Sequence, residues 1–202
     1  MSTAVLTPPR SAPVQPLKPH RWTIAEYRKL DKSGLFHDKR TMLLDGEIYV
    51  MPMPSPPHNA SLSLTEEFLR SVIPPGHHLR NQQGFDVGTR NDPGPDLAVV
   101  AGAIRDYSQS TPTTAVWIVE IAVSSLTTDT TIKVELYAQA GVPEYWVLDV
   151  EGRQVLVYRD PDPRPAGLGA NAYRNRQSFG ANDYVSPLAA PTARVKVSDL
   201  LP

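Results

Sequence analysis

The chain has 202 residues, of which 41% are hydrophobic and 20% charged, a composition typical of a soluble globular protein. Its net charge of −1 excludes a positive field over the whole molecule, so nucleic-acid binding would require a local basic patch. The absence of cysteine excludes disulfides and thiolate chemistry. The sequence has no secretory signal and no run of roughly 18 apolar residues, which predicts a cytoplasmic protein without a membrane partner.

The beginning of the chain is rich in proline. Five of the 21 prolines fall within the first twenty residues, which predicts a flexible arm over residues 1–20. The remaining length suits a single domain over residues 21–202, whose core we expect at about residues 40–160.

A helix, a hairpin and a second helix are predicted next. Thr23 and Glu26 have the spacing of a capping box, which indicates a helix over residues 23–34. Asp45-Gly46 joins two apolar runs and is a strong signal for a β-hairpin. The proline-punctuated segment MPMPSPPHNA predicts a loop, followed by a helix over residues 59–73.

The second half of the chain alternates strands with a helix. We expect strands over residues 78–87, 96–102 and 115–123, the last of them apolar enough to be covered on both faces. Thr127 or Thr128 would cap a helix that Gly141 closes, before strands over residues 142–150 and 154–159. This order predicts an α/β domain, with a right-handed crossover if strands 115–123 and 142–150 are parallel.

Glu120 is the one charged residue inside the apolar strand 115–123. Strand alternation places it on the same face as Ile118 and Ala122. An unpaired buried carboxylate costs several kcal/mol or becomes protonated. A structural salt bridge would explain Glu120, but buried ion pairs are poor stabilisers, so a functional role has at least equal weight.

Three further charged residues could meet Glu120. Asp96 begins the strand 96–102, and Asp129 and Lys133 lie four positions apart on one helix face. Their ordinary roles would be a turn for Asp96 and a surface ion pair for the other two. Two close carboxylates repel unless a proton or a cation lies between them, and Mg²⁺ favours a few carboxylate oxygens with water and phosphate. A nearby lysine could orient or deprotonate a water, or stabilise negative charge on a phosphate.

The stretches PDLAVV, WIVEIAVSSLTTDTTIKVELYAQAGVPEYWVLD and LLDGEIYVMPMPSPPH resemble the Uma-two family of bacterial endonucleases, in the PD-(D/E)XK superfamily. The resemblance covers about residues 21–160. It implies a restriction-endonuclease-like fold, with a mixed central sheet flanked by helices, and DNA as the partner. It also implies Mg²⁺-dependent phosphodiester hydrolysis, with Mn²⁺ as a second usable ion, and a homodimer. By position, Asp96 and Glu120 would bind the metal and Lys133 would be the catalytic lysine.

Two positions depart from the family pattern. Ala122 stands where the E-x-K motif has its lysine, which leaves that role to the lysine of the following helix. Met42 stands where the family usually has an acidic residue before the hairpin turn. His58 matches a histidine of the family, and either bonds to backbone at a helix start or contacts a phosphate or carries a proton. The supporting candidates for the site are thus Asp129, Glu47 and His58.

Two functions follow as hypotheses. The first is a Mg²⁺-dependent endonuclease that uses two carboxylates and a lysine. The second is a catalytically impaired member of the fold that acts as a DNA-binding or protein-interaction module, which Met42 and the absence of net positive charge favour. A hydrolase of another phosphate ester is a third, weaker hypothesis.

Overall fold

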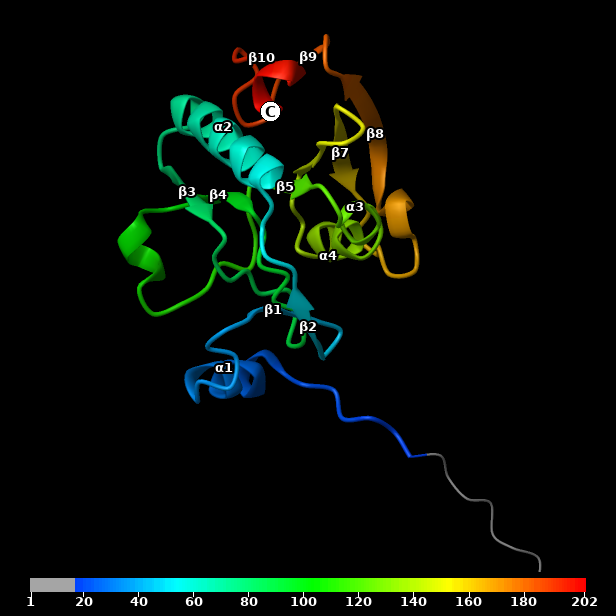
Figure 1. The fold of residues 1–202 in the computed structure, drawn as a ribbon. Coiled ribbons are helices and arrows are strands. Elements are labelled where there is room, and N and C mark those ends of the chain that lie inside the picture. Colours follow the sequence, from blue (N-terminus) through cyan, green and yellow to red (C-terminus); the bar gives the residue numbers. More distant parts are fainter. Residues whose placement is uncertain (1–16) are drawn as a thin grey trace, which may run out of the picture.

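The computed structural model describes residues 17–202 (Figure 1). The predicted flexible arm therefore lies outside the described residues, apart from residues 17–20. In the part of the chain that is described, every helix is too short or too polar to cross a bilayer.

A six-stranded mixed sheet forms the centre, in the order β3-β4-β5-β6-β7-β8. Its strands are β3 (His77–Asn81), β4 (Leu97–Ala101), β5 (Trp117–Ala122), β6 (Glu144–Asp149), β7 (Gln154–Pro161) and β8 (Tyr173–Gly180). Only β5 and β6 are parallel among these neighbours, and the other pairs are antiparallel. This arrangement confirms the predicted mixed α/β fold. The sequence did not predict β8, because its largely exposed residues, YRNRQSFG, lack hydrophobic alternation.

Helices cover both faces of the sheet (Figure 1). The helix α2 (Pro56–Val72) and the C-terminal turn η3 (Val197–Leu200) pack against one face, where Trp117 and Ile121 are buried with Leu69. The helices α3 (Leu126–Thr130) and α4 (Ile132–Gln139) lie over the other face, where Ile118 and Ala122 are buried with Tyr137. The predicted alternation is therefore confirmed within β5, since its even and odd apolar residues enter different cores. Before β5 it reverses, because Ala115 is buried with the even residues and Val116 packs with the odd ones.

Two helix boundaries differ from the prediction. The helix α2 begins at Pro56, three residues earlier than expected, because proline has no N–H to lose in a first helical turn and its φ suits that turn. The single helix expected near residues 127–140 is instead broken at Thr131, whose φ of −125° and ψ of −78° are not helical. The hydroxyls of Thr130 and Thr131 donate to the carbonyls of Leu126 and Thr127, so threonine side chains bind backbone at this break.

The helix α1 (Ile24–Lys32) and the hairpin of β1 (Arg40–Leu44) and β2 (Glu47–Met51) form a separate layer beside the sheet. The predicted capping box is present, since the Thr23 hydroxyl accepts from the Glu26 N–H and the Glu26 carboxylate accepts from the Thr23 N–H. A small core of Ile24, Tyr27 and Leu43 joins the helix to the hairpin. The other short elements are η1 (Ile104–Tyr107), η2 (Gly169–Ala172), β9 (Tyr184–Val185) and β10 (Val195–Lys196).

Candidate active site

Strand pairing brings Asp96 to Glu120. The antiparallel register pairs Leu97 with Val119, so the preceding residue, Asp96, lies opposite Glu120. The Asp96 N–H donates to Glu120 Oε2 at 3.3 Å, and the Ile121 N–H donates to Asp96 Oδ2 at 2.9 Å. The two carboxylates predicted to act together are therefore held by the backbone of adjacent strands.

Lys133 reaches back from α4 to this pair. Its Nζ lies 2.8 Å from Glu120 Oε1 and 3.2 Å from Asp129 Oδ1, and all three side chains are buried. The Tyr137 hydroxyl also donates to Glu120 Oε1, at 2.5 Å. The sequence did not reveal this role of Tyr137, although its position four residues after Lys133 places both on one helix face.

His58 joins the site through a contact with Asp96. Its Nε2 lies 3.2 Å from Asp96 Oδ2, and Gln82 Nε2 donates to Asp96 Oδ1 at 3.0 Å. The early start of α2 puts His58 in the first helical turn. Its Nδ1 is buried and has no hydrogen-bond partner within residues 17–202, so His58 does not take the backbone-bonding role. The hydrogen bond with Asp96 raises the pKa of His58 above its ordinary value.

The site groups three carboxylates with one lysine and one histidine. Burial raises the pKa of Glu120 to about 8, because Lys133 only partly offsets desolvation and the repulsion from Asp129 and Asp96. Burial alone would lower the pKa of Lys133, but the attraction of the carboxylates, Glu120 first, raises it above its ordinary value. Burial likewise works against the ionised form of Asp96, yet the hydrogen bond from His58 and the charge of Lys133 lower its pKa. A bound cation beside Glu120 would favour its ionised form.

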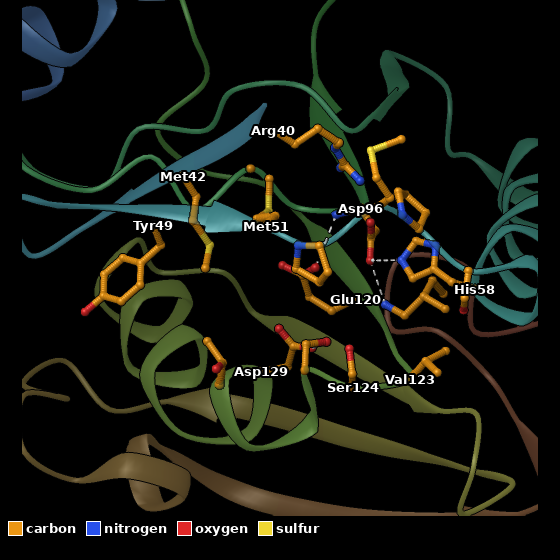
Figure 2. A pocket seen from close by; sticks show the side chains of 18 of the residues that line it. Arg40, Met42, Tyr49, Met51, His58, Asp96, Glu120, Val123, Ser124 and Asp129 are labelled. Atoms are coloured by element: carbon orange, nitrogen blue, oxygen red, sulfur yellow. Dashed lines mark hydrogen bonds and ion pairs between the residues drawn. The ribbon is translucent and has the colours of Figure 1, made fainter. Parts of the chain in front are cut away.

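One open cavity of about 430 Å³ is lined by His58, Asp96, Glu120, Asp129 and Lys133. Figure 2 shows Asp96 and His58 on one side of it, and Asp129 and Ser124 along its floor. Met42 also lines the cavity, so the position where the family usually has an acid does face the site. The structure does not bring Glu47 to the other candidate residues. It stands next to the hairpin turn, opposite Leu44, and its carboxylate pairs with Arg21 at 2.6 Å rather than lining the cavity.

The donor set suits a hydrated Mg²⁺ ion rather than a metal enclosed by protein. Within residues 17–202, no three His, Asp or Glu side chains are grouped as a self-sufficient metal site. Two carboxylates are enough for Mg²⁺, because this ion keeps several waters and takes further oxygens from substrate phosphates. The buried Asp129 Oδ1 lacks an aligned hydrogen-bond donor in the same part of the chain. By charge and by their oxygen donors, Asp96 and Glu120 would suit a hydrated divalent cation that takes its remaining ligands from water and substrate.

The comparison with known sequences decides the family. The profile of Uma2, described as "Putative restriction endonuclease", matches residues 24–195. The chain belongs to the Uma2 family. This result confirms the resemblance drawn from the sequence motifs, and Uma2 is a nuclease-like family. No curated protein sequence matches the chain.

A solved structure agrees with this assignment at the level of the fold. The chain is similar to the crystal structure of a putative nuclease belonging to DUF820 from Anabaena variabilis ATCC 29413, with a TM-score of 0.67 and 20% sequence identity. The match covers 88% of this chain and 96% of that one. At this identity the likeness shows a shared fold.

Proposed function

We propose that this Uma2 protein is a Mg²⁺-dependent endodeoxyribonuclease. The observation that carries the proposal is the reach of Lys133 across the strand-helix connection to Glu120, with Nζ 2.8 Å from Oε1 beside the paired Asp96. A buried ammonium and two carboxylates that line an open cavity have the charges required to hydrolyse a phosphodiester. Membership of a restriction-endonuclease family and the nuclease-like fold support this proposal.

Each residue has a distinct part in the proposed reaction. Asp96 and Glu120 would hold Mg²⁺, which when bound lowers the pKa of a coordinated water and neutralises phosphate charge. The Lys133 ammonium would orient the attacking water and stabilise the charge that develops on phosphorus. The water oxygen would form the new bond to phosphorus as a P–O bond to the sugar breaks; the attacking water would release one proton to solvent, and the leaving oxygen would take one up from solvent. Tyr137 and His58 position the two carboxylates through the hydrogen bonds described above.

The proposal has two further parts. Mn²⁺ should replace Mg²⁺, because both are hard cations with oxygen ligands. A homodimer would supply one site for each strand of a duplex, and sedimentation in the presence and absence of DNA would reveal it.

Two measurements test the proposal. Calorimetric titration with Mg²⁺ should show binding by the wild type and none by Glu120→Gln, while the exposed control Glu67→Gln should bind as the wild type does. Plasmid DNA with Mg²⁺ should then be nicked by the wild type and by the control Lys32→Ala, and not by Lys133→Ala. Equal Mg²⁺ binding by wild type and Glu120→Gln, or no binding by either, would refute the metal site.

A second function is favoured by one observation, the side chain of Met42 on the cavity wall in place of an acid. In that case the protein would be a catalytically impaired DNA-binding or protein-interaction module. Binding of Mg²⁺ without cleavage of any DNA would support this alternative and reject the nuclease.

A further inference from the structure

One face of the β1-β2 hairpin forms an apolar wall of the cavity. The register pairs Arg40 with Met51 and Met42 with Tyr49, and cross-strand partners two residues apart share a face of the hairpin. All four residues line the cavity that contains Asp96 and Glu120. Figure 2 shows this face across the cavity from Asp129 and Ser124.

The wall contains more exposed apolar surface than the fold requires. Tyr49 on this face is 40% exposed, and Met53, just after the hairpin, is 81% exposed; both line the same cavity. The hairpin makes its own core contacts through Leu43 and Ile48, so these side chains are not needed to hold it in place. The Tyr49 hydroxyl donates to Glu47 at 2.7 Å, which orients the ring. Clustered exposed apolar side chains next to polar groups are typical of a binding surface.

Arg40 adds a positive charge to this wall. It is half-buried and makes no ion pair within residues 17–202, whereas Arg21 and Arg28 in the same layer are paired with carboxylates. A guanidinium is well suited to bind a phosphate oxygen pair. An unpaired cation beside an apolar, partly aromatic surface has the chemistry that recognises a nucleotide, with the phosphate on the cation and the base on the apolar surface.

We propose that this wall binds an unstacked nucleobase of the DNA strand next to the phosphate to be cut, with Arg40 on an adjoining phosphate. The preferred substrate would then be single-stranded or locally unpaired DNA, because a base within a duplex cannot lay its face on a protein surface without leaving the stack. The inference rests on the proposed nuclease function, because the wall and the carboxylates line the same cavity and the base is placed next to the phosphate that the carboxylate site would cut. A cavity of about 430 Å³ is within the size range of small-molecule sites, and so has room for a nucleotide.

Binding without cleavage tests this inference separately from catalysis. Fluorescence anisotropy in EDTA would compare a labelled single-stranded oligonucleotide with its duplex. The wild type should bind the single strand more tightly. Tyr49→Ser should weaken single-strand binding by roughly fivefold or more, as expected for the loss of a base-stacking contact, and leave duplex binding unchanged. Met53→Ser should also weaken single-strand binding, through the loss of apolar contact with the base, and leave duplex binding unchanged. Ile104→Ser, a change at an apolar residue that is 72% exposed and lies outside the cavity, is the control.

Arg40→Gln provides a second, different readout. Loss of one phosphate contact to a single strand should reduce the slope of log K against log salt concentration by about 0.7. Equal affinity for single strand and duplex, with no effect of the wall variants, would overturn the inference. A change in sedimentation of the wall variants, with DNA binding unaltered, would also overturn it and assign the wall to a second copy of the chain. If the binding results hold and Mg²⁺ supports no cleavage, the nuclease proposal fails while the base-binding wall stands.

Discussion

Replacement of Lys133 by methionine should destabilise the fold strongly. The substitution keeps most of the side-chain volume but removes the ammonium from two buried carboxylates, at 2.8 and 3.2 Å. Loss of one partner of a buried ion pair costs about 3–5 kcal/mol, because the remaining charge is left uncompensated. For a chain of this size, that change lowers the melting temperature by roughly 6–20 °C, at about 2–4 °C per kcal/mol. Arg70→Met, which removes an exposed pair with Glu66, should cost only about 0.3–0.5 kcal/mol.

The test is chemical denaturation of a double-mutant cycle. Glu120→Gln combined with Lys133→Met removes both partners, and should be more stable than the sum of the single changes predicts, by about 0.5–3 kcal/mol. Mg²⁺ should also stabilise Lys133→Met, by about 2.7 kcal/mol at a concentration one hundred times the Kd of that variant, if it binds the carboxylates of the folded state. Additive single effects together with no stabilisation by Mg²⁺ would show that Lys133 does not compensate Glu120, and the reasoning behind the site would be wrong.

Three smaller predictions follow from neighbouring contacts. Tyr137→Phe removes one donor to Glu120, should lower the free energy of unfolding by about 1.5–3 kcal/mol in denaturation, and should weaken Mg²⁺ binding in calorimetry. Met42→Glu adds a carboxylate at the cavity wall and should tighten Mg²⁺ binding by roughly tenfold, since affinity rises with the charge of the ligands; unchanged affinity would place that side chain outside the metal site. Burial raises the pKa of Asp92, so the folded state binds the Asp92 proton more tightly than the unfolded state does. The free energy of unfolding of the wild type, relative to that of Asp92→Asn, should therefore increase as the pH falls through the folded pKa of Asp92. Stability of both proteins measured by urea denaturation between pH 7 and pH 4 would show a constant difference if this reasoning is wrong.

The core of the site could be predicted because regular backbone geometry determines it. The alternation of a strand puts Glu120 on the face opposite Val119 and Ile121. The contact expected between Asp129 and Lys133 is present at 3.2 Å, although the break at Thr131 places the two residues on successive helices. Asp-Gly between apolar runs was enough to predict the hairpin. These features depend on local rules, and the structure follows them.

Other features depend on which elements pack together, and sequence patterns do not contain that information. Nothing in the spacing between His58 and Asp96 indicates that the start of α2 lies against the start of β4, yet the two side chains are 3.2 Å apart. Glu47 was a candidate because it lies near Met42 in the sequence, but the strand register places it beside the hairpin turn, where its carboxylate pairs with Arg21. The break at Thr131 also escaped the prediction, because threonine is compatible with helix and its backbone-bonding alternative is decided by context.

The small side chain of Ala122 explains how a lysine on the helix can form an ion pair with a carboxylate on the strand. Ala122 is two residues after Glu120 on the same face of β5, and is buried in the same cluster as Val134 and Tyr137 of α4. A lysine at this position would occupy space that the helix now fills. With alanine there, α4 packs close enough for Tyr137 and Lys133 both to reach Glu120 Oε1, at 2.5 and 2.8 Å. Ala122→Lys should therefore not restore activity to a Lys133→Ala protein, because the added side chain would overpack the core and displace the helix that orients Glu120.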